Sequence, residues 1–118
     1  MTTTTTVETG ASAEDRAAAL LASAGYAIVE RNVECQIGEL DIVARDPHGV
    51  LVFVEVRSRA DAEHGHAAEM VGPRKRRRVA RMARWYLHTR TPVFEEVRFD
   101  VVAITGDEID HIADAWRM

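Results

Sequence analysis

Hydrophobic and polar residues alternate most regularly between Gly38 and Arg59, where two segments rich in β-branched residues flank the turn Asp46-Pro47-His48-Gly49. Because proline fixes φ and glycine accepts positive φ, this pattern predicts a β-hairpin. Side chains alternate along a strand, so each strand has two faces. On the second strand, one face carries Val50, Val52, Val54 and Val56, and the other Leu51, Phe53, Glu55 and Arg57. On the first strand, one face carries Glu39, Asp41 and Val43, and the other Leu40, Ile42 and Ala44.

Apolar residues recur at helical spacing in two other segments. The first follows Ser12, which can form a capping box with Asp15, and the pattern predicts a helix to about Ala24. The second opens at Pro73, a residue favoured at the first position of a helix, and predicts a helix to about His88. These two helices lie on either side of the hairpin in the sequence.

The remaining segments favour strands and a tail. Strands are predicted over Tyr26–Val33 and Val97–Ile104, and a last strand or short terminal element over Ile109–Trp116. Residues 1–11 begin with a threonine run and predict a disordered tail. Residues 12–118 therefore form a single domain. Its fold class is mixed α/β (α+β), with the order α-β-β-β-α-β and an extra C-terminal strand or element.

Composition is that of an ordinary globular protein, with 47% hydrophobic and 29% charged residues. No apolar run approaches the ~20 residues of a membrane span, and no signal peptide precedes the domain, so we expect a cytoplasmic protein without a membrane partner. Cys35 is the only cysteine, which excludes an internal disulfide and a cysteine-based zinc site. Residues 60–65 predict a polar loop; His64 lies in it and His66 directly follows it, and a solvated loop is favoured there over a metal-binding pair.

Basic residues are concentrated in one segment. The net charge is −4, yet eight of the fifteen basic residues lie between Arg74 and Arg90, with no acidic residue among them. Like charges one helical turn apart repel, so the pattern indicates a phosphate-binding side, with a solvated face as the alternative. Trp85 and Tyr86 on the same helix are expected in the core. The candidate phosphate-binding residues are Arg74, Lys75, Arg77, Arg78, Arg81 and Arg84.

Two carboxylates occupy the predicted hairpin at positions where burial is costly. Glu55 stands between two valines, and Asp41 lies on the neighbouring strand. At a separation of ~4 Å their charges would repel by roughly 4 kcal/mol at an effective dielectric constant of 20. A shared proton, a nearby cation, or Mg²⁺ or Mn²⁺ would relieve this repulsion; alternatively, both acids lie in water at frayed strand ends. Glu14 lies in the first turn of the predicted helix, where an acid can simply complement the helix dipole.

The chain resembles the bacterial YraN family. The likeness rests on Gly38-Glu39-Leu40-Asp41-Ile42-Val43-Ala44 followed by Val52-Phe53-Val54-Glu55-Val56-Arg57-Ser58-Arg59. It extends to the helix with Glu14, to Gly25-Tyr26, Glu30-Arg31-Asn32 and Lys75, and to Arg98-Phe99-Asp100-Val101-Val102. YraN proteins resemble the archaeal Holliday-junction resolvases and, more widely, nucleases of the PD-(D/E)XK type. The resemblance implies a restriction-endonuclease-like core, in which helices flank a mixed central sheet.

The same resemblance implies a metal site. Nucleases of this type assemble it from an acid on the first helix, an Asp on the second strand and a Glu-x-Lys on the third. Glu14, Asp41 and Glu55 match the acids and would hold Mg²⁺ or Mn²⁺, and Glu39 would support these ligands from the same strand face. Arg57 stands where the lysine is expected; it could bind the scissile phosphate but in practice cannot lose a proton.

The implied function is metal-dependent hydrolysis of phosphodiesters in branched or structured DNA, with the basic helix holding flanking phosphates. A two-fold homodimer would suit an enzyme that acts on two strands. One alternative keeps nucleic-acid binding but drops catalysis, and is favoured by Arg57 and by the acidic net charge. A further alternative is a module that binds an acidic protein surface through Arg74–Arg84.

Overall fold

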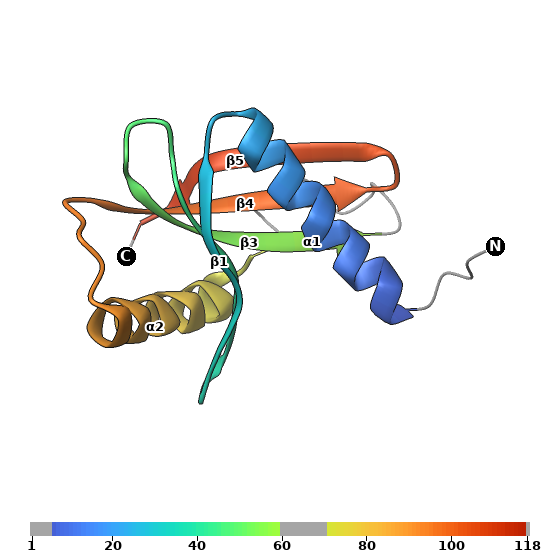
Figure 1. Cartoon of the computed structure of the whole chain (residues 1–118). Helices are drawn as coiled ribbons and strands as arrows, with labels where there is room; N and C mark the ends of the chain where they lie inside the picture. Colours follow the sequence, from blue (N-terminus) through green and yellow to red (C-terminus); the bar gives the residue numbers. More distant parts are fainter. Residues whose placement is uncertain (1–5, 60–70, 118) are drawn as a thin grey trace.

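Five strands form one mixed sheet with a helix on each face (Figure 1). The computed structural model describes residues 6–59 and 71–117, so the predicted loop with His64 and His66 lies outside the described residues. The elements are α1 (Thr6–Ser23), β1 (Ala27–Cys35), β2 (Gly38–Arg45), β3 (Leu51–Arg59), α2 (Pro73–Arg90), β4 (Val97–Thr105) and β5 (Glu108–Trp116). This order confirms the predicted α-β-β-β-α-β core, and β5 is the extra C-terminal strand. Within the described ranges, neither helix is long and apolar enough to cross a membrane.

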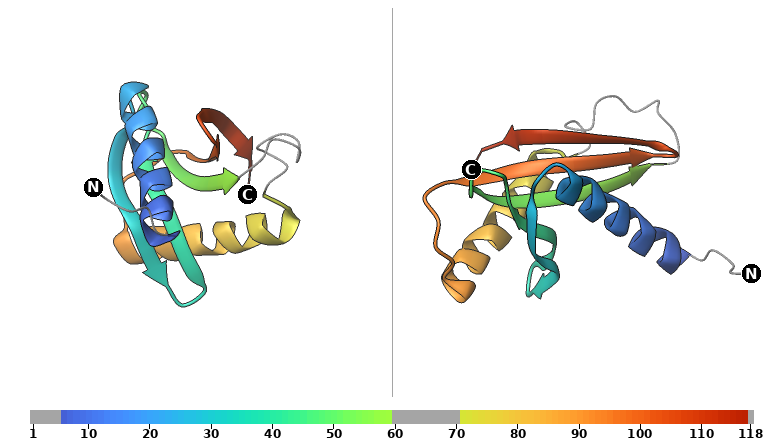
Figure 2. Two further views of the ribbon diagram at one scale, coloured as in Figure 1. Left: turned by 90° about the vertical axis from the view of Figure 1, so that its right-hand side faces the viewer. Right: turned by 45° about the horizontal axis from the view of Figure 1, so that its top comes forward.

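The strands lie side by side in the order of the sequence, β1-β2-β3-β4-β5. All neighbouring pairs are antiparallel except β3 and β4, which are parallel. Parallel strands need a crossover connection, and α2 lies in the segment that joins them. The two views in Figure 2 show α2 beneath the sheet and α1 on the opposite face. The parallel pair thus explains why one face is covered by α2.

Helix α1 begins earlier than the capping pattern predicts. It starts at Thr6, so Ser12 lies inside the helix rather than at its N-cap. Each residue added to an existing helix adds a backbone hydrogen bond, so a local capping signal does not stop a helix that the preceding residues can continue. Residues 1–5 of the predicted tail lie outside the described residues. Glu14 is therefore in the middle of α1, and the prediction that it complements the helix dipole in the first turn is wrong.

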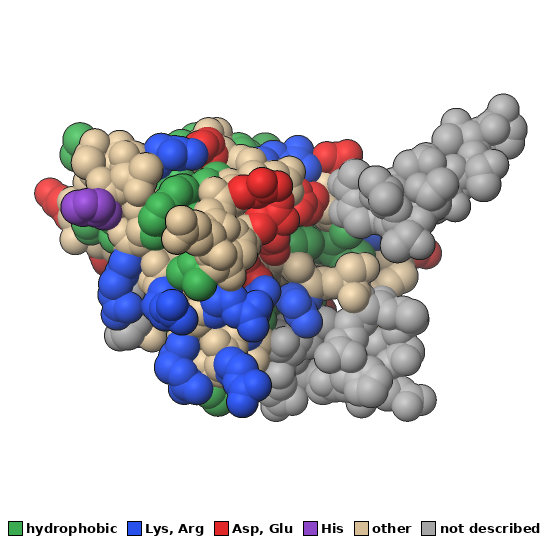
Figure 3. All heavy atoms as spheres, turned by 90° about the horizontal axis from the view of Figure 1, so that it is seen from below, with side chains coloured by type: hydrophobic (Ala, Val, Ile, Leu, Met, Phe, Trp, Pro, Cys, Tyr) green, Lys and Arg blue, Asp and Glu red, His purple; other side chains and the backbone are tan. Residues whose placement is uncertain are grey.

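The outer face of α2 is basic. The helix begins as predicted, with Gly72 as N-cap residue and Pro73 at the first helical position. It ends two residues beyond the predicted end, at Arg90. Figure 3, which views the molecule from below, shows basic side chains gathered in a band on this surface. The exposed arginines of the helix are Arg74, Arg77, Arg78, Arg81, Arg84 and Arg90. Arg90 differs from the others because it pairs with Glu30 at 3.2 Å.

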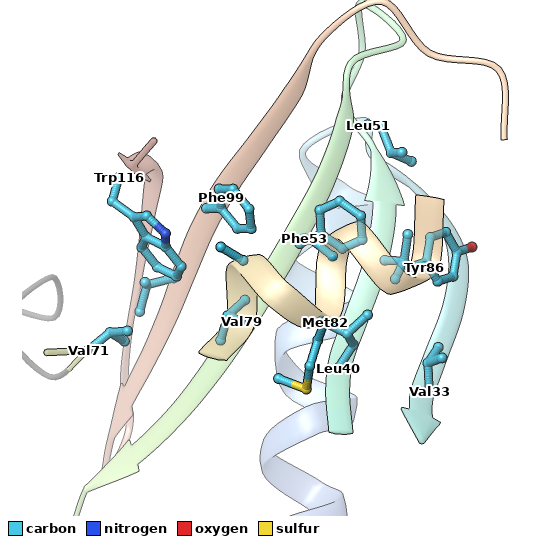
Figure 4. Close-up of a cluster of buried hydrophobic side chains, with 14 of the residues drawn as sticks. Val33, Leu40, Leu51, Phe53, Val71, Val79, Met82, Tyr86, Phe99 and Trp116 are labelled. Atoms are coloured by element: carbon cyan, nitrogen blue, oxygen red, sulfur yellow. The ribbon is translucent and has the colours of Figure 1, made fainter. Parts of the chain in front are cut away.

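The inner face of α2 packs on the sheet around Phe53 and Phe99 (Figure 4). Tyr86 meets Phe53 edge-on at 5.6 Å between ring centroids, and Phe53 stacks on Phe99 at 5.8 Å. Trp116, at the end of β5, stacks on Phe99 at 5.0 Å. Tyr86 is buried and Trp85 partly buried against the same cluster, which confirms that both belong to the core. These aromatic contacts connect α2 to β3, β4 and β5.

The opposite face of the sheet packs against α1. Ala17 and Leu21 of the helix are fully buried against Val52 and Val54 of β3. The valines of β3 therefore face α1, whereas Leu51 and Phe53 face α2. This arrangement confirms the two faces predicted for the second strand of the hairpin.

Strand β2 does not keep the predicted alternation. Leu40 packs with Val43 on the α2 side of the sheet, whereas Ile42 packs on the α1 side. The prediction that Leu40 and Ile42 share a face is therefore wrong. The cause is the pairing of β2, which follows β3 only over Ile42–Arg45 and continues toward Gly38 paired with β1 alone. A two-stranded ribbon twists more strongly than a full sheet, and Figure 1 shows this pair extending past α2.

A buried ionic cluster fixes the other end of the sheet. Asp100 on β4 has no exposed surface, and Arg98 joins it to Asp46 in the β2–β3 turn through a 2.8 Å ion pair. Burial opposes ionisation of Asp100, but the hydrogen bonds outweigh it and lower the pKa of this carboxyl to about 2. The partners of Asp100 are Arg98 Nε at 3.0 Å, the Tyr26 hydroxyl at 3.0 Å, His111 Nε2 at 2.8 Å and the Asp114 N–H at 2.9 Å.

We predict that Asp100 makes the fold sensitive to acid. Its pKa is about 2 in the fold and ~3.9 in an unfolded chain. A depressed pKa stabilises the fold above the unfolded value, so a contribution of roughly 3 kcal/mol is present at neutral pH and is lost as the pH falls from about 4 to 2. Urea unfolding of wild type and Asp100→Asn should show a stability difference that shrinks over this range. Asp107→Asn, in the exposed β4–β5 turn, is the control. A difference between wild type and Asp100→Asn that is constant with pH would contradict the assignment.

Candidate metal centre and nucleic-acid interface

Asp41 and Glu55 lie where β2 and β3 separate. The ladder between the two strands ends at the pair Ile42–Val54, so each strand carries one of the acids at the next position. Beyond this point the Val56 N–H has no partner in the β2 ladder and donates to Asp41 Oδ2 at 2.9 Å. The side chain of Asp41 thus replaces a backbone acceptor. This hydrogen bond holds its carboxylate beside the β3 segment that carries Glu55.

Glu55 is a buried carboxylate with a raised pKa. Its side chain is 2% exposed, and its Oε1 lies 3.2 Å from Lys75 Nζ on α2. Burial raises the pKa of Glu55 and the charge of Asp41 raises it further; Lys75 and Arg57 oppose this rise, and the pKa reaches about 7. The alternative that both acids lie in water at frayed strand ends is therefore wrong for Glu55. A further positive charge would favour its ionised form.

Glu14 and Glu39 extend the acidic group from Asp41 toward solvent. One carboxylate oxygen from each of Glu14, Glu39 and Asp41 lies within 4.8 Å of the others. Burial and the charge of Asp41 raise the pKa of Glu14, while Arg31, at 3.7 Å, opposes the rise. Burial also raises the pKa of Asp41, and Glu39 adds to this. Glu55 is not part of this group of three, so Asp41 is the residue that both halves of the site share.

Arg57 faces the same site. It is half-buried on β3, two residues after Glu55, and its charge lowers the pKa of both Asp41 and Glu55. The structure therefore brings together all four residues of the predicted site, together with Glu39. The donors are carboxylate oxygens from α1, β2 and β3, and such hard ligands fit Mg²⁺ or Mn²⁺. The raised pKa values of Glu14, Asp41 and Glu55 indicate a place where a cation would be stabilised.

Lys75 contacts Glu55, a neighbour that the sequence does not predict for it. The sequence groups Lys75 with the candidate phosphate-binding residues of α2, and the structure places its ammonium 3.2 Å from Glu55 Oε1. Two signals set this residue apart: it is the only lysine in the chain, and it lies at the edge of the apolar side of an arginine-rich helix. The aliphatic part of lysine tolerates burial while its ammonium reaches a partner.

The exposed arginines border the acidic group. Arg78 lies against Gly38, the residue before Glu39, because a Cβ atom at Gly38 would be 3.9 Å from Arg78 Cδ. Figure 3 shows acidic side chains directly beside the basic band. Within residues 6–59 and 71–117, no ion pair joins Arg74, Arg77, Arg78, Arg81 or Arg84 to an acid. A surface suited to cations therefore lies next to one suited to phosphates.

We predict that Glu55 destabilises the metal-free protein as the pH rises. Its pKa is about 7 in the fold, above the ~4.3 of an unfolded chain, so its contribution is most favourable below the unfolded value and is lost as the pH rises through 7. In Glu55→Gln, the amide at position 55 does not ionise, so this pH dependence is removed. In urea unfolding with EDTA, the variant should gain stability relative to wild type between pH 5 and 8. Glu95→Gln, at an exposed position, is the control. A stability difference that does not change with pH would rule out a raised pKa.

Comparison with known proteins identifies a family. Residues 13–104, which contain every residue of the acidic site, match the uncharacterised protein family UPF0102. A UPF0102 protein of Syntrophus aciditrophicus is 41% identical, covering 98% of this chain and 93% of its own length. One of Cupriavidus taiwanensis is 48% identical over 91% of this chain and 81% of its own, and one of Persephonella marina 38% identical over 92% and 93%. The chain belongs to the UPF0102 family, which is the YraN family.

Proposed function

We propose that this protein is a metal-dependent nuclease that hydrolyses phosphodiesters in branched or otherwise structured DNA. The observation that supports this most strongly is the state of Glu55. A buried carboxylate with a pKa of about 7 lies beside Asp41 and contacts a lysine on the helix that carries the exposed arginines. Strongly perturbed carboxylates are common at catalytic centres, because burial and like charges are what tune them.

Asp41 and Glu55 would hold the metal ion, with Glu14 and Glu39 on the solvent side of Asp41. Mg²⁺ or Mn²⁺ bound there would neutralise the carboxylates, polarise a phosphate oxygen and lower the pKa of a water molecule. The hydrogen bond from the Val56 N–H would fix the orientation of the Asp41 carboxylate toward the metal ion.

Lys75 would supply the amine that the Glu-x-Lys pattern places at residue 57. Its Nζ is 3.2 Å from Glu55 Oε1, so it lies within the site although it comes from α2. An ammonium there stabilises negative charge that develops on the phosphate, and a lysine can also exchange a proton. Arg57 would hold a phosphate oxygen through two parallel hydrogen bonds. Lys75 would thus stabilise charge and exchange a proton, and Arg57 would bind the phosphate.

The arginines of α2 would hold the phosphates that flank the scissile bond. Their charges lie on a protein with a net charge of −4, so the field of the molecule directs an anionic strand to this one face. Each phosphate contact steepens the dependence of binding on salt. A two-fold dimer that acts on two strands stays a prediction.

The second candidate function is nucleic-acid binding without hydrolysis. The Lys75–Glu55 ion pair favours it, because a lysine that neutralises Glu55 permanently would leave no need for a metal ion. Binding of a divalent ion at Asp41 and Glu55 distinguishes the two functions.

We predict that Mn²⁺ binding depends on Asp41 and Glu55. In calorimetric titrations, Asp41→Asn and Glu55→Gln should each lose well over about tenfold in affinity, because loss of a residue that only supports a ligand already costs about tenfold or more. Glu39→Gln removes the same charge from an exposed position, and its loss should be smaller than that of either ligand variant. DNA affinity in EDTA should stay within about threefold of wild type in all three variants. Unchanged Mn²⁺ affinity in Asp41→Asn would eliminate this site. A larger loss in Glu39→Gln than in Glu55→Gln would place the ion on the solvent side of Asp41.

We predict that hydrolysis requires the ammonium of Lys75 but does not require a guanidinium at position 57, where another cation can replace it. With Mn²⁺ and a branched DNA substrate, Lys75→Met should lower the cleavage rate by about 10²-fold, as is typical for loss of one stabilising donor. Arg57→Lys should keep the rate within about tenfold. Mn²⁺ titration of Lys75→Met serves as the control for an intact metal site. Equal rates for wild type and Lys75→Met would assign the lysine a purely structural role.

A further inference from the structure

A second cationic site lies on the side of α2 that faces β5. A cleft of about 460 Å³ opens between the first turns of α2 and the end of β5. Pro73 and Ala80 are among the residues that line it. We call it the Trp116 cleft; its functional lining is Arg76, Arg77, Arg81, Arg84, Trp116 and Arg117. Neither Arg74 nor Arg78 lines it, although both are exposed on the same helix.

The floor of the Trp116 cleft is held in place by packing. Trp116 is 8% exposed and stacks on Phe99 with only 13° between the ring planes. The guanidinium of Arg76 lies 5.7 Å from the centre of the Trp116 ring, and its Nε donates to the Val71 carbonyl at 2.7 Å. A rigid, largely apolar floor excludes water from one side of the cleft. Charges at such a surface interact more strongly than charges surrounded by water.

The walls of the cleft are cationic. Arg77, Arg81 and Arg84 follow one another at helical spacing, so their guanidinium groups repel. Among the described residues they have no carboxylate partner. Arg117 on the β5 side is different, since it pairs with Asp114 at 2.8 Å and reaches Glu96 at 3.9 Å. Guanidinium groups bind phosphate oxygens through paired hydrogen bonds, so an anion with several oxygens would relieve the repulsion along α2.

We infer that the Trp116 cleft binds a phosphate group of the nucleic-acid strand that the protein holds. The inference rests on the proposed function and makes one part of the basic helix a defined binding site. Lys75 and Arg77 flank Arg76 in the sequence but face different sides of α2, toward Glu55 and toward the cleft. An α-helix with its side chains is about 10–12 Å across, so one strand can reach both sites within a few nucleotides. The bound group is either a terminal phosphate or a backbone phosphate, which share this chemistry.

The test compares two double variants of the full chain that lose the same charge. Arg77→Gln/Arg84→Gln removes two cleft arginines, whereas Arg74→Gln/Arg78→Gln removes two arginines that do not line the cleft. Fluorescence anisotropy with a short labelled single-stranded DNA in EDTA should show at least tenfold weaker binding for the first. The second should show a smaller loss, of about threefold, because its arginines hold phosphates only at the open outer face of α2. The salt slope should fall by about one for each cleft arginine lost. Equal losses in the two variants would mean general attraction only and would overturn the inference.

The source of the phosphate is resolved in the same assay. Tighter binding of a 5′-phosphorylated than of a 5′-hydroxyl strand, lost in Arg77→Gln/Arg84→Gln, would identify a terminal phosphate. Equal binding of both strands, with the tenfold loss still present in that variant, would identify a backbone phosphate. Either result supports the cleft as a phosphate site.

A second readout reports on the cleft itself. In a Trp85→Phe background, Trp116 is the only tryptophan, and its fluorescence should change when DNA binds. The change should disappear in the Arg77→Gln/Arg84→Gln variant; DNA binding that leaves the fluorescence unaltered would place the strand elsewhere. Because no metal is present, these results are independent of hydrolysis. If the wild-type protein binds DNA through the cleft but neither binds Mn²⁺ nor cleaves DNA, the proposed nuclease function is overturned and the inference about the cleft is not.

Discussion

The end of the β2–β3 ladder at Ile42 and Val54 is the constraint on which the site depends. Up to that pair the strands satisfy each other's backbone groups; beyond it they separate, and Asp41 accepts the hydrogen bond from the Val56 N–H. A buried amide without an acceptor would be costly, so the Asp41 side chain has a structural reason to stay there. The same separation opens space for Glu55, and it frees β2 to twist toward α2.

Burying two neighbouring carboxylates destabilises the fold, and packing elsewhere in the protein compensates for this. Glu55 is buried with its charge next to that of Asp41, and its partner Lys75 must come from a different element. The aromatic contacts of Phe53 with Tyr86 and Phe99 hold α2 on the sheet and thereby position this lysine. Functional sites in proteins often retain such unfavourable arrangements, because stability gained elsewhere compensates for them. Loosening α2 would therefore disturb the acids before it unfolded the sheet.

Helix α2 separates two kinds of chemistry on one surface. Its inner edge carries Lys75 toward the carboxylates, and its outer and β5-facing sides carry arginines toward solvent and the Trp116 cleft. Residues only one or two positions apart in the sequence thus face different ligands, because successive helical residues are rotated by about 100°. The acidic remainder of the chain leaves this face as the place where an anionic strand is attracted.

Sequence alone determined the order of elements, the two faces of β3 and the core side of α2, because alternation and helical periodicity are local properties. It made a meeting of Asp41 and Glu55 only one of two alternatives, because the register of a hairpin depends on how its two strands pair. It placed the start of α1 wrongly, because a capping signal at Ser12 competes with helix extension. Only the tertiary structure decided the rest. Separation of β2 from β3 decides which side of the sheet Leu40 faces. Packing between elements distant in the sequence decides the contact of Lys75 with Glu55 and the cleft between α2 and Trp116. No local pattern encodes such contacts, because the residues that make them meet only once the sheet has formed.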